Sequence, residues 1–512
     1  MPESKLLSPD SLIMSGAHSF PLILLTSTLA YITYSLLTAL YNLTLHPLAK
    51  FPGPKLDGAF DFPRYWYMYL GDSAARFTEL HDQYGKVVRV APNRLSFNTA
   101  QSFTDIYLSK GSDGYPLAKD REQYTDSIDP GLRNLVTLDN PTHKKHRRAM
   151  TYAFSPSAVR EQEATVHSYC TLLMSRLKAQ ITDPSVKGKV DLVRWLNFTT
   201  FDIIGDLAFA ESFHCLETGK NSLWMTAVFQ NLKVATFMRI ARGYPLLNFA
   251  LQTAIKWSPS VAMTVTKLRK DSQDKMARRL ASKTDRKDFT SHFLKHGEGI
   301  MTDKDLLGNA SLFILAGSET SATLLSGLIY LLLKSPDCMQ KVRDEIDAAS
   351  NDVSEMTFVK EAQLPFLHAC IEETFRVYPP VPMELNRVTP LEGATIDGIF
   401  VPGNKSVATS HLGTYHSSSN FKDPLEFHPE RFLGDKRYAG DDLAALQPFS
   451  VGPRNCIGMN LAYAEIRSIV TRVLWNFDIS LCAESEGWLD QKMWLLWDKK
   501  PLMVKLKDRN RM

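Results

Sequence analysis

One cysteine lies in a short segment bounded by glycines, and this segment limits what the chain can be more than any other feature. It runs Phe449-Ser450-Val451-Gly452-Pro453-Arg454-Asn455-Cys456-Ile457-Gly458. Because glycine has no side chain to clash, Gly452 and Gly458 let backbone amides approach the Cys456 sulfur. A thiolate shares its charge with a metal and with nearby donors, so the spacing predicts an axial ligand to haem iron. Arg454 supplies a planar, permanent charge that suits a haem propionate. The alternative is a buried structural cysteine in a loop.

The length allows one large domain or several smaller ones, and the composition does not indicate nucleic-acid binding. The 512 residues include 59 Lys plus Arg and 55 Asp plus Glu, and the difference of +4 is spread along the chain. Six cysteines are scattered without a C-x-x-C pair, which argues for a reducing compartment and against a disulfide scaffold or a zinc site. No repeat or long polar linker divides residues 47–512, so we expect a single domain there.

The N-terminus carries a long uncharged segment. No Asp, Glu, Lys or Arg occurs from Ser11 to Ala49, and its densest apolar part, Phe20 to Leu40, is long enough to span a bilayer as a helix. A cleaved signal peptide is the alternative, but no clear small-x-small cleavage site follows before Pro47. We therefore predict an N-terminal segment, residues 1–46, with a retained membrane anchor at about residues 20–40.

Basic and rigid residues follow the apolar segment. Lys50 and Lys55 lie on its C-terminal side, so the positive-inside rule places the large domain in the cytosol. Phe51-Pro52-Gly53-Pro54 fixes backbone angles at the junction, and we expect it to orient the domain against the bilayer.

Hydrophobic periodicity predicts a mainly helical domain with a minor β region. Short alternating segments at Val87–Ala91 and Ser406–Ser410 are predicted strands. Strand and helix alternate too irregularly for a doubly wound fold. The predicted helices are Ser73–Tyr84, Thr142–Phe154, Ala158–Lys178, Leu192–Ala210, Thr302–Lys334, Pro336–Ser350 and Pro365–Val377.

The longest predicted helix has a polar interruption, Ala316-Gly317-Ser318-Glu319-Thr320-Ser321. Glycine and hydroxyl residues destabilise the middle of an apolar helix, because glycine loosens the turn and hydroxyls compete for backbone carbonyls. A functional role for Glu319 and Thr320 would explain their presence there. The alternatives are a solvent-facing polar stripe and a notch for helix packing.

Two charged clusters accompany these motifs. Glu373 and Arg376 are three residues apart and share one helix face, and Arg431 follows between apolar residues before the cysteine segment. In the basic segment His143-Lys144-Lys145-His146-Arg147-Arg148, His143 and Arg147 share one face. The other cations of this segment either lie on a solvated surface or dock an acidic protein.

Together these motifs resemble those of the cytochrome P-450 superfamily, the haem-thiolate monooxygenases, from about Phe51 to the C-terminus. The combination of Tyr41-Asn42-Leu43-Thr44-Leu45-His46-Pro47 with Phe51-Pro52-Gly53-Pro54 is similar to filamentous-fungal microsomal members, including relatives of isotrichodermin hydroxylases. The resemblance implies a P-450 fold, mainly α with a minor β region, preceded by a transmembrane helix.

The resemblance also implies a cofactor and its ligands. Haem b (iron protoporphyrin IX) would take Cys456 as its axial thiolate and metal ligand, with Gly452 and Gly458 beside the sulfur. Phe449 would pack over the proximal side and limit water access. The propionates would bind Arg454, His143, Arg147 and Arg387.

Thr320 and Glu319 would be the catalytic residues, the hydroxyl binding dioxygen and the acid connecting it to water for proton delivery. Glu373, Arg376 and Arg431 would form a structural network that holds the cysteine loop against the core. The pocket would draw on residues 111–135, residues 229–249, Phe313 and Ala316, residues 381–385 and residues 494–497.

The expected function is hydroxylation or epoxidation of a lipophilic small molecule with O2. No G-x-G-x-x-G fingerprint occurs, so electrons would come from NADPH through a separate flavoprotein reductase. The expected location is the endoplasmic reticulum membrane, single-pass with the catalytic domain facing the cytosol, in a terpenoid or polyketide pathway of fungal secondary metabolism. A haem-thiolate isomerase or peroxygenase that needs no reductase, and a non-enzymatic haem sensor, are the alternatives.

Overall fold

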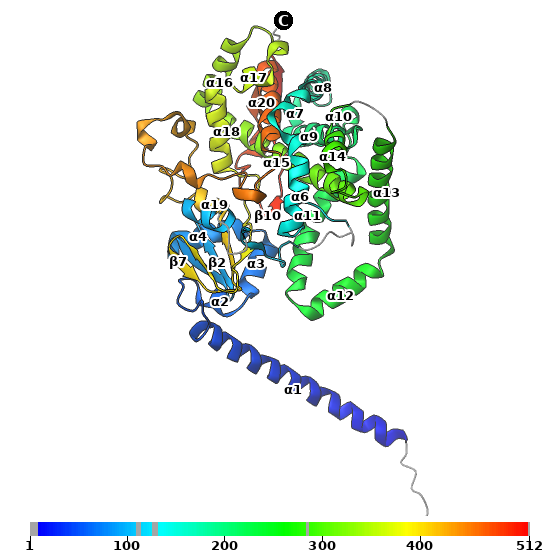
Figure 1. The fold of residues 1–512 in the computed structure, drawn as a ribbon, viewed down its shortest axis with the longest axis vertical. Helices are drawn as coiled ribbons and strands as arrows, with labels where there is room; N and C mark the ends of the chain where they lie inside the picture. Colours follow the sequence, from blue (N-terminus) through cyan, green and yellow to red (C-terminus); the bar gives the residue numbers. More distant parts are fainter. Residues whose placement is uncertain (1–8, 109–113, 125–131, 283–285, 510–512) are drawn as a thin grey trace, which may run out of the picture.

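A computed structural model describes residues 9–108, 114–124, 132–282 and 286–509. Helices make up most of this part of the chain, and the strands gather on one side of it (Figure 1). The α-helices are α1 (Pro9–Thr44), α2 (Lys55–Ala59), α3 (Phe62–Leu70), α4 (Ser73–Tyr84), α5 (Ala100–Phe103), α6 (Asn140–Thr151), α7 (Pro156–Glu161), α8 (Glu163–Thr182), α9 (Leu192–Phe209), α10 (Cys215–Thr218), α11 (Leu223–Arg242), α12 (Pro245–Lys256), α13 (Pro259–Ala281), α14 (Phe289–Gly297), α15 (Asp303–Lys334), α16 (Pro336–Ala349), α17 (Phe358–Glu361), α18 (Pro365–Val377), α19 (His411–Tyr415) and α20 (Met459–Asn476).

The strands form one larger sheet and several small ones. The five-stranded sheet has the order β1-β2-β8-β5-β3, in which only β2 and β8 run parallel, and a three-stranded sheet has the order β4-β12-β9. Two hairpins, β6-β7 and β10-β11, complete the set. The strands are β1 (Val87–Ala91), β2 (Arg94–Phe97), β3 (Ala118–Lys119), β4 (Lys189–Asp191), β5 (Arg387–Val388), β6 (Ala394–Ile396), β7 (Ile399–Val401), β8 (Ser406–Thr409), β9 (Phe477–Leu481), β10 (Met493–Trp494), β11 (Leu496–Trp497) and β12 (Met503–Asp508).

Helix α15 runs through the middle of the molecule (Figure 1), where it contacts α9, α18 and α20. Thr302 caps its N-terminus: the hydroxyl accepts from the Asp305 amide, and the Asp305 carboxylate accepts from the Thr302 amide. Ser335 ends it before a proline, which cannot continue the helix. Helices α9, α18 and α20 cover the faces of α15 with a continuous apolar core.

The predicted helices and strands occur close to their expected bounds, with one exception. The helix predicted at Ala158–Lys178 is broken at Gln162 into α7 and α8. The apolar periodicity continues across this break, but α7 packs on α20 and the turn at residues 152–154, whereas α8 packs on α9 and α20. Tertiary packing therefore overrides a continuous helical pattern here.

Helix α1 projects away from the body of the molecule (Figure 1). Within it, Leu22–Thr44 is long and apolar enough to cross a membrane. Its mean hydropathy is 1.6, and only 6% of its most apolar stretch is buried. Helix α15 meets the same length and hydropathy criteria, but 72% of its most apolar stretch is buried, as expected for a core helix. Leu22–Thr44 is therefore a candidate transmembrane span, which agrees with the predicted architecture.

The end of α1 is bonded to the body of the molecule. Asn42 donates to the Ala59 carbonyl at 2.9 Å, and its own carbonyl accepts from Arg89 at 2.8 Å. His46 lies 2.9 Å from Asn93, and Leu48 is fully buried. These contacts join residues 42–48 to α2 and to the β1-β2 region, and the domain boundary at residue 47 stays a prediction.

Candidate functional site

The segment around Cys456 folds into a tight turn before α20. The Cys456 amide donates to the Phe449 carbonyl at 2.9 Å, which closes the turn. Burial raises the pKa of the Cys456 thiol, whereas a hydrogen bond from the Gly458 amide and the charge of Arg147 lower it. The Cys456 side chain is nevertheless exposed. The residue is therefore surrounded by protein atoms and yet accessible to solvent, as expected for a side chain that borders an internal space.

The two glycines of this segment have different roles. Gly452 has a φ of +79°, and a Cβ on it would overlap the Tyr107 carbonyl, so this position requires glycine for its backbone and its packing. Gly458 has a φ of −88° and its nearest neighbour, a Phe154 ring carbon, is 4.0 Å away. Its contribution is therefore the amide donated to Cys456.

Phe449 anchors the start of the cysteine segment to the core. Its ring lies edge-on to Phe375 of α18, with centroids 5.1 Å apart, and 5.2 Å from the ring of Tyr463 in α20. Two helices therefore fix the position from which the segment approaches Cys456.

One face of α15 is less covered than the rest of the helix. Ala316 is exposed and Thr320 is half-buried, whereas the next turns of the helix, Ser321 to Leu332, are buried. Ala316 and Thr320 are four residues apart and share this face. The Thr320 hydroxyl donates to the Ala316 carbonyl at 2.6 Å, which satisfies the alcohol while leaving its lone pairs free to accept.

Glu319 does not lie with Thr320. Its carboxylate pairs with Lys499 at 2.5 Å, and both side chains are buried, 2% and 3% exposed. Lys499 also donates to the Thr323 hydroxyl at 2.8 Å, and the second carboxylate oxygen of Glu319 has no hydrogen-bond partner among the described residues. Glu319 is therefore held in a buried ion pair, and its part in proton delivery stays a prediction.

A cluster of cations lies close to the cysteine segment. Burial, followed by the charge of Arg387, lowers the pKa of Arg454 to about 10, and Arg387 is itself buried beside the Tyr107 ring. Lys119 belongs to the same cluster: burial and the charges of Arg387 and Arg454 hold its pKa well below the usual value. Within the described part of the chain, none of these three cations has a carboxylate within 4 Å.

Lys119 is a candidate site residue that sequence reasoning missed. It lies in the two-residue strand β3, which pairs with β5 so that Lys119 is opposite Arg387. Neither the motif spacing nor the hydrophobic periodicity indicates this position, because the strand pairing joins Lys119 to Arg387, 268 positions later (387 − 119). An isolated lysine in a polar stretch carries no signal of its own.

His143 and Arg147 lie on α6 beside this cluster, and each has a contact that limits its role. Burial, then the charges of Arg454, Arg147 and Lys119, lower the pKa of His143 to about 3, so its imidazole is neutral at physiological pH. Arg147 donates to the Asn455 carbonyl at 2.6 Å and to the Asn455 side chain at 2.8 Å. Arg147 therefore holds the residue next to Cys456, and His143 is restricted to an uncharged hydrogen bond.

The predicted network of one acid and two arginines is assembled in full. Glu373 pairs with Arg376 at 2.8 Å and with Arg431 at 3.0 Å, and all three side chains are completely buried. Arg431 also pairs with Asp441, a fourth member that the sequence did not indicate. Arg376 donates to the Tyr415 and Glu426 carbonyls, so the network fixes α18 against residues 415–441. Its link to the cysteine segment runs through Phe375 and Phe449.

These residues fit a planar, dianionic cofactor with a metal at its centre. The Cys456 sulfur borders an internal space, and beside it stands a group of desolvated cations, none of which has a carboxylate of the described residues within 4 Å. Buried cations are stable only when an anion compensates them, and two propionates supply that charge. Within the described residues there is no group of three His, Cys, Asp or Glu that could hold a metal ion.

Comparison with known proteins gives the same answer. The sequence model of the cytochrome P450 family matches residues 63–506. The chain belongs to the cytochrome P450 family. Cytochrome P450 monooxygenase astJ of Aspergillus oryzae is 37% identical over 499 residues, 96% of this chain and 99% of the relative. Averantin hydroxylase of Dothistroma septosporum is 38% identical over 94% of this chain and 90% of the relative.

Membership of the cytochrome P450 family establishes the enzyme class and the cofactor. The chain is a haem-thiolate monooxygenase that uses cysteine-ligated haem b, with electrons supplied from NADPH through a reductase. Haem with a thiolate ligand supplies oxygen activation, because the sulfur pushes electron density towards the metal.

The segments expected to line the P450 substrate pocket differ in how deeply they are buried. Phe313 packs into an aromatic cluster with Phe154, Phe289 and Phe293, and Trp497 stacks on Tyr378 in the core. Ala316 and the half-buried Val381 and Leu385 are more open. Residues 111–113 and 125–131, and the side chains of residues 229–232, lie outside the described part.

Proposed function

We propose that this P450 hydroxylates or epoxidises a lipophilic small molecule in fungal secondary metabolism, while anchored to the endoplasmic reticulum membrane by α1. The exposed sulfur of Cys456 within the protein interior is the observation that carries the assignment of Cys456 as the axial ligand. Arg454, Arg387 and Lys119 would hold the propionates, and His143 would add a neutral donor. Arg147 would position the turn through Asn455.

Two relatives support the reaction class and the pathway. Averantin hydroxylase and cytochrome P450 monooxygenase FUM2 of Gibberella moniliformis are each 38% identical to this chain, and FUM2 is matched over 99% of its length. The first name states a hydroxylation. The substrate and the position that is oxidised belong to each enzyme separately, because one fold hosts many specificities.

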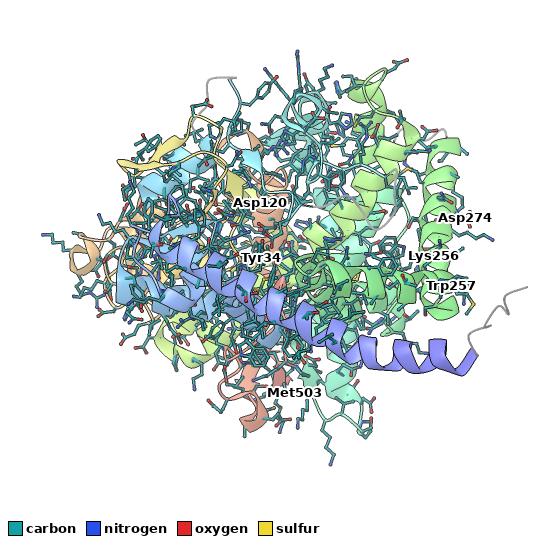
Figure 2. All side chains as sticks on the ribbon, turned by 90° about the horizontal axis from the view of Figure 1, so that it is seen from below. Tyr34, Asp120, Lys256, Trp257, Asp274 and Met503 are labelled. Carbon is teal, nitrogen blue, oxygen red and sulfur yellow. The ribbon has the colours of Figure 1, made fainter. Side chains whose placement is uncertain are left out.

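The underside of the molecule supports membrane association. In the view from below, helix α1 crosses this face, and Lys256 and Trp257 lie to one side of the helix (Figure 2). Trp257 is 77% exposed, Leu246 87% and Phe249 74%, so the segment around α12 presents large apolar side chains outside the body. An amphipathic substrate dissolved in the membrane would reach such a face directly.

The basic surface of α6 supports a flavoprotein reductase as the electron donor. Lys144, Lys145 and Arg148 are exposed, while Arg147 on another face of the same helix bonds to Asn455 beside Cys456. An acidic donor bound to the exposed cations would therefore sit next to the thiolate turn.

Thr320 is proposed to accept and pass a proton at its hydroxyl. The bond to the Ala316 carbonyl holds the hydroxyl on the open face of α15, where it can receive a hydrogen bond from a reactant or a water. Replacement by alanine is expected to leave NADPH consumption in place while product falls and peroxide rises. Unchanged product per NADPH would remove Thr320 from the reaction.

The carbon monoxide spectrum of the reduced full-length protein tests the central assignment. Wild type is expected to show the red-shifted band of thiolate ligation, and Cys456→Ser is expected to lose it. Cys482→Ser is the matched control, since Cys482 is a half-buried cysteine in a different segment. A thiolate band that persists in Cys456→Ser would overturn the assignment.

Turnover with NADPH and a reductase, compared with turnover on peroxide alone, separates a monooxygenase from a peroxygenase.

A further inference from the structure

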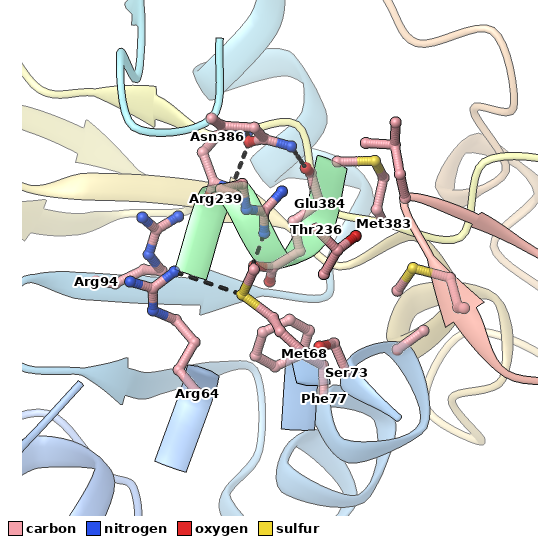
Figure 3. A pocket seen from close by; sticks show the side chains of 14 residues that line it. Arg64, Met68, Ser73, Phe77, Arg94, Thr236, Arg239, Met383, Glu384 and Asn386 are labelled. Atoms are coloured by element: carbon pink, nitrogen blue, oxygen red, sulfur yellow. Dashed lines mark hydrogen bonds between the residues drawn. The ribbon is translucent and has the colours of Figure 1, made fainter. Parts of the chain in front are cut away.

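A second cavity lies beside the cofactor site, between α3, α4, α11 and the segment that leads into β5 (Figure 3). Its enclosed volume is about 40 Å³, and this rises to about 550 Å³ when the open space at its mouth is included. Apolar side chains form part of its wall, among them Met68, Phe77 and Met383. Three arginines, Arg64, Arg94 and Arg239, also line it, which is unusual for a cavity that only stores an apolar molecule.

Two of these arginines are neutralised by neighbouring acids. Arg64 pairs with Glu122 at 2.8 Å, and Arg94 pairs with Glu122 and Asp120, each at 3.1 Å. These pairs form a connected network in which each guanidinium has a carboxylate. Arg64 and Arg94 therefore add little net attraction for a ligand.

Arg239 differs from the other two arginines. Among the described residues no carboxylate lies within 4 Å of it, and its guanidinium donates to the Met68 sulfur at 3.3 Å, as the dashed line in Figure 3 shows. A thioether is a weak acceptor, so this contact leaves the charge uncompensated. Burial, followed by the charges of Arg64 and Arg94, lowers the pKa of Arg239 to about 10, and the charge of Glu122 offsets only part of this.

The acid on the opposite wall does not replace the missing counter-ion. Glu384 lines the same cavity, but its carboxyl accepts a short hydrogen bond from the Ser96 hydroxyl. Burial raises the pKa of Glu384, so its carboxyl group loses its proton less readily in this position than in water. The cavity therefore presents one unpaired cation and an apolar wall.

We propose that this cavity binds the anionic head group of an amphipathic carboxylic acid through Arg239, with the apolar remainder of the ligand against Met68, Phe77 and Met383. The planar guanidinium offers two parallel donors to a carboxylate, and binding would compensate its charge. Glu384 and Asn386 of the cavity wall directly precede Arg387 of the cation cluster, so the cavity adjoins the cofactor site. That the ligand is a substrate rests on the proposed function.

Calorimetric titration of the full-length holoenzyme in neutral detergent tests this site without turnover. Decanoate is the probe, and decan-1-ol is its uncharged counterpart. Decanoate is expected to bind wild type at least tenfold more tightly than decan-1-ol, and Arg239→Gln to weaken decanoate binding about 10- to 100-fold, as for loss of a charge-assisted contact. Lys233→Gln is the matched control, since it removes an exposed charge from the same helix, and its decanoate affinity is expected to stay unchanged.

Equal decanoate affinity in wild type and Arg239→Gln would overturn the site, as would equal wild-type affinity for the acid and the alcohol. The carbon monoxide spectrum shows whether Arg239→Gln folds. If it does not, the decanoate affinity of Arg239→Lys and the ratio of decanoate to decan-1-ol affinity in wild type decide the question. Repeating the titration in nanodiscs separates two sources of the head group: weaker decanoate binding in discs with phosphatidylserine indicates a lipid, and equal binding indicates a free acid. A failure of the proposed function would appear instead as lack of NADPH-driven turnover, with these affinities unaffected.

Discussion

At the scale of single residues, the cysteine turn shows that two glycines in one motif act for different physical reasons. Both were predicted to give amides access to the Cys456 sulfur. The structure gives that role to the Gly458 amide, whereas Gly452 is required by its left-handed backbone and by the Tyr107 carbonyl against it. A sequence motif shows that a glycine is present but does not show which of its properties is used.

Replacing each glycine by alanine separates these roles. Gly452→Ala is expected to destabilise the protein by more than about 1 kcal/mol and to reduce haem content, because alanine is strained at this φ and would overlap Tyr107. Gly458→Ala keeps the amide and has room for a methyl group, so it serves as the control with near wild-type stability. Urea unfolding and haem content per chain measure both effects. Equal loss in the two variants would contradict this account.

Glu465 gives a residue-scale prediction about pH. It is buried in α20, and burial raises the pKa of its carboxyl from 4.5 to about 8, with only a partial offset from a hydrogen bond with Ser321. The folded state therefore holds the proton more tightly than the unfolded state does. The stability that this group contributes is complete below pH 4.5 and is lost as the pH rises towards 8.

Replacing Glu465 by glutamine, which keeps the shape and cannot ionise, is expected to remove that loss. The variant should match wild type at pH 5 and exceed it in free energy of unfolding at pH 8, by an amount on the order of 1 kcal/mol or more. Urea unfolding at both pH values measures the difference. A wild-type pH dependence that persists in Glu465→Gln would show that another group is responsible.

At the scale of elements, the pair of Glu319 in α15 and Lys499 before β12 illustrates how a helix motif depends on a distant segment. Helix α15 could be predicted because its cap, its periodicity and its terminating Ser335-Pro336 are all local. The partner of Glu319 could not, since Lys499 is 180 positions away. The same reason explains why Lys119 and Lys499 escaped prediction while Cys456, Arg454 and Glu373 did not. Helix α20 was missed because Gly458 offers no side-chain cap and the segment before it resembles a loop.

Removing Lys499 tests the buried ion pair. Lys499→Met is expected to destabilise the protein by about 3–5 kcal/mol, because Glu319 is left as an unpaired buried acid. The double variant Glu319→Gln, Lys499→Met removes both charges and should recover most of that loss. Urea unfolding at pH 7 of the two single variants and the double variant completes the cycle. A double variant no more stable than Lys499→Met would contradict the pairing.

At the scale of the whole molecule, the junction between α1 and the body is part of the folded structure. Hydrogen bonds from Asn42, His46 and Arg89 cross it, and the Arg89 amide also donates to the Pro52 carbonyl at 2.7 Å. The sequence predicted both the apolar span and the rigid residues after it. It did not predict the bonds, because they depend on the packing of residues 42–48 against β1 and β2.

Two truncations test where the body begins. Deleting residues 1–40 removes most of the apolar span and keeps Asn42, His46 and Leu48, so the product is expected to be released from membranes with unchanged thermal stability. Deleting residues 1–50 leaves Arg89 without its acceptors at Asn42 and His46 and exposes the site of Leu48, with an expected loss of about 2–4 kcal/mol. Ultracentrifugation and thermal unfolding measure the two outcomes. Equal stability of both products would place the start of the body after residue 50.

The bonded junction also has a kinetic consequence. If α1 spans a bilayer as proposed, a body joined to it by hydrogen bonds rather than by a loose tether would keep one tilt relative to that bilayer. A partner in the same bilayer would then reach a productive encounter by lateral diffusion and by rotation about the membrane normal alone.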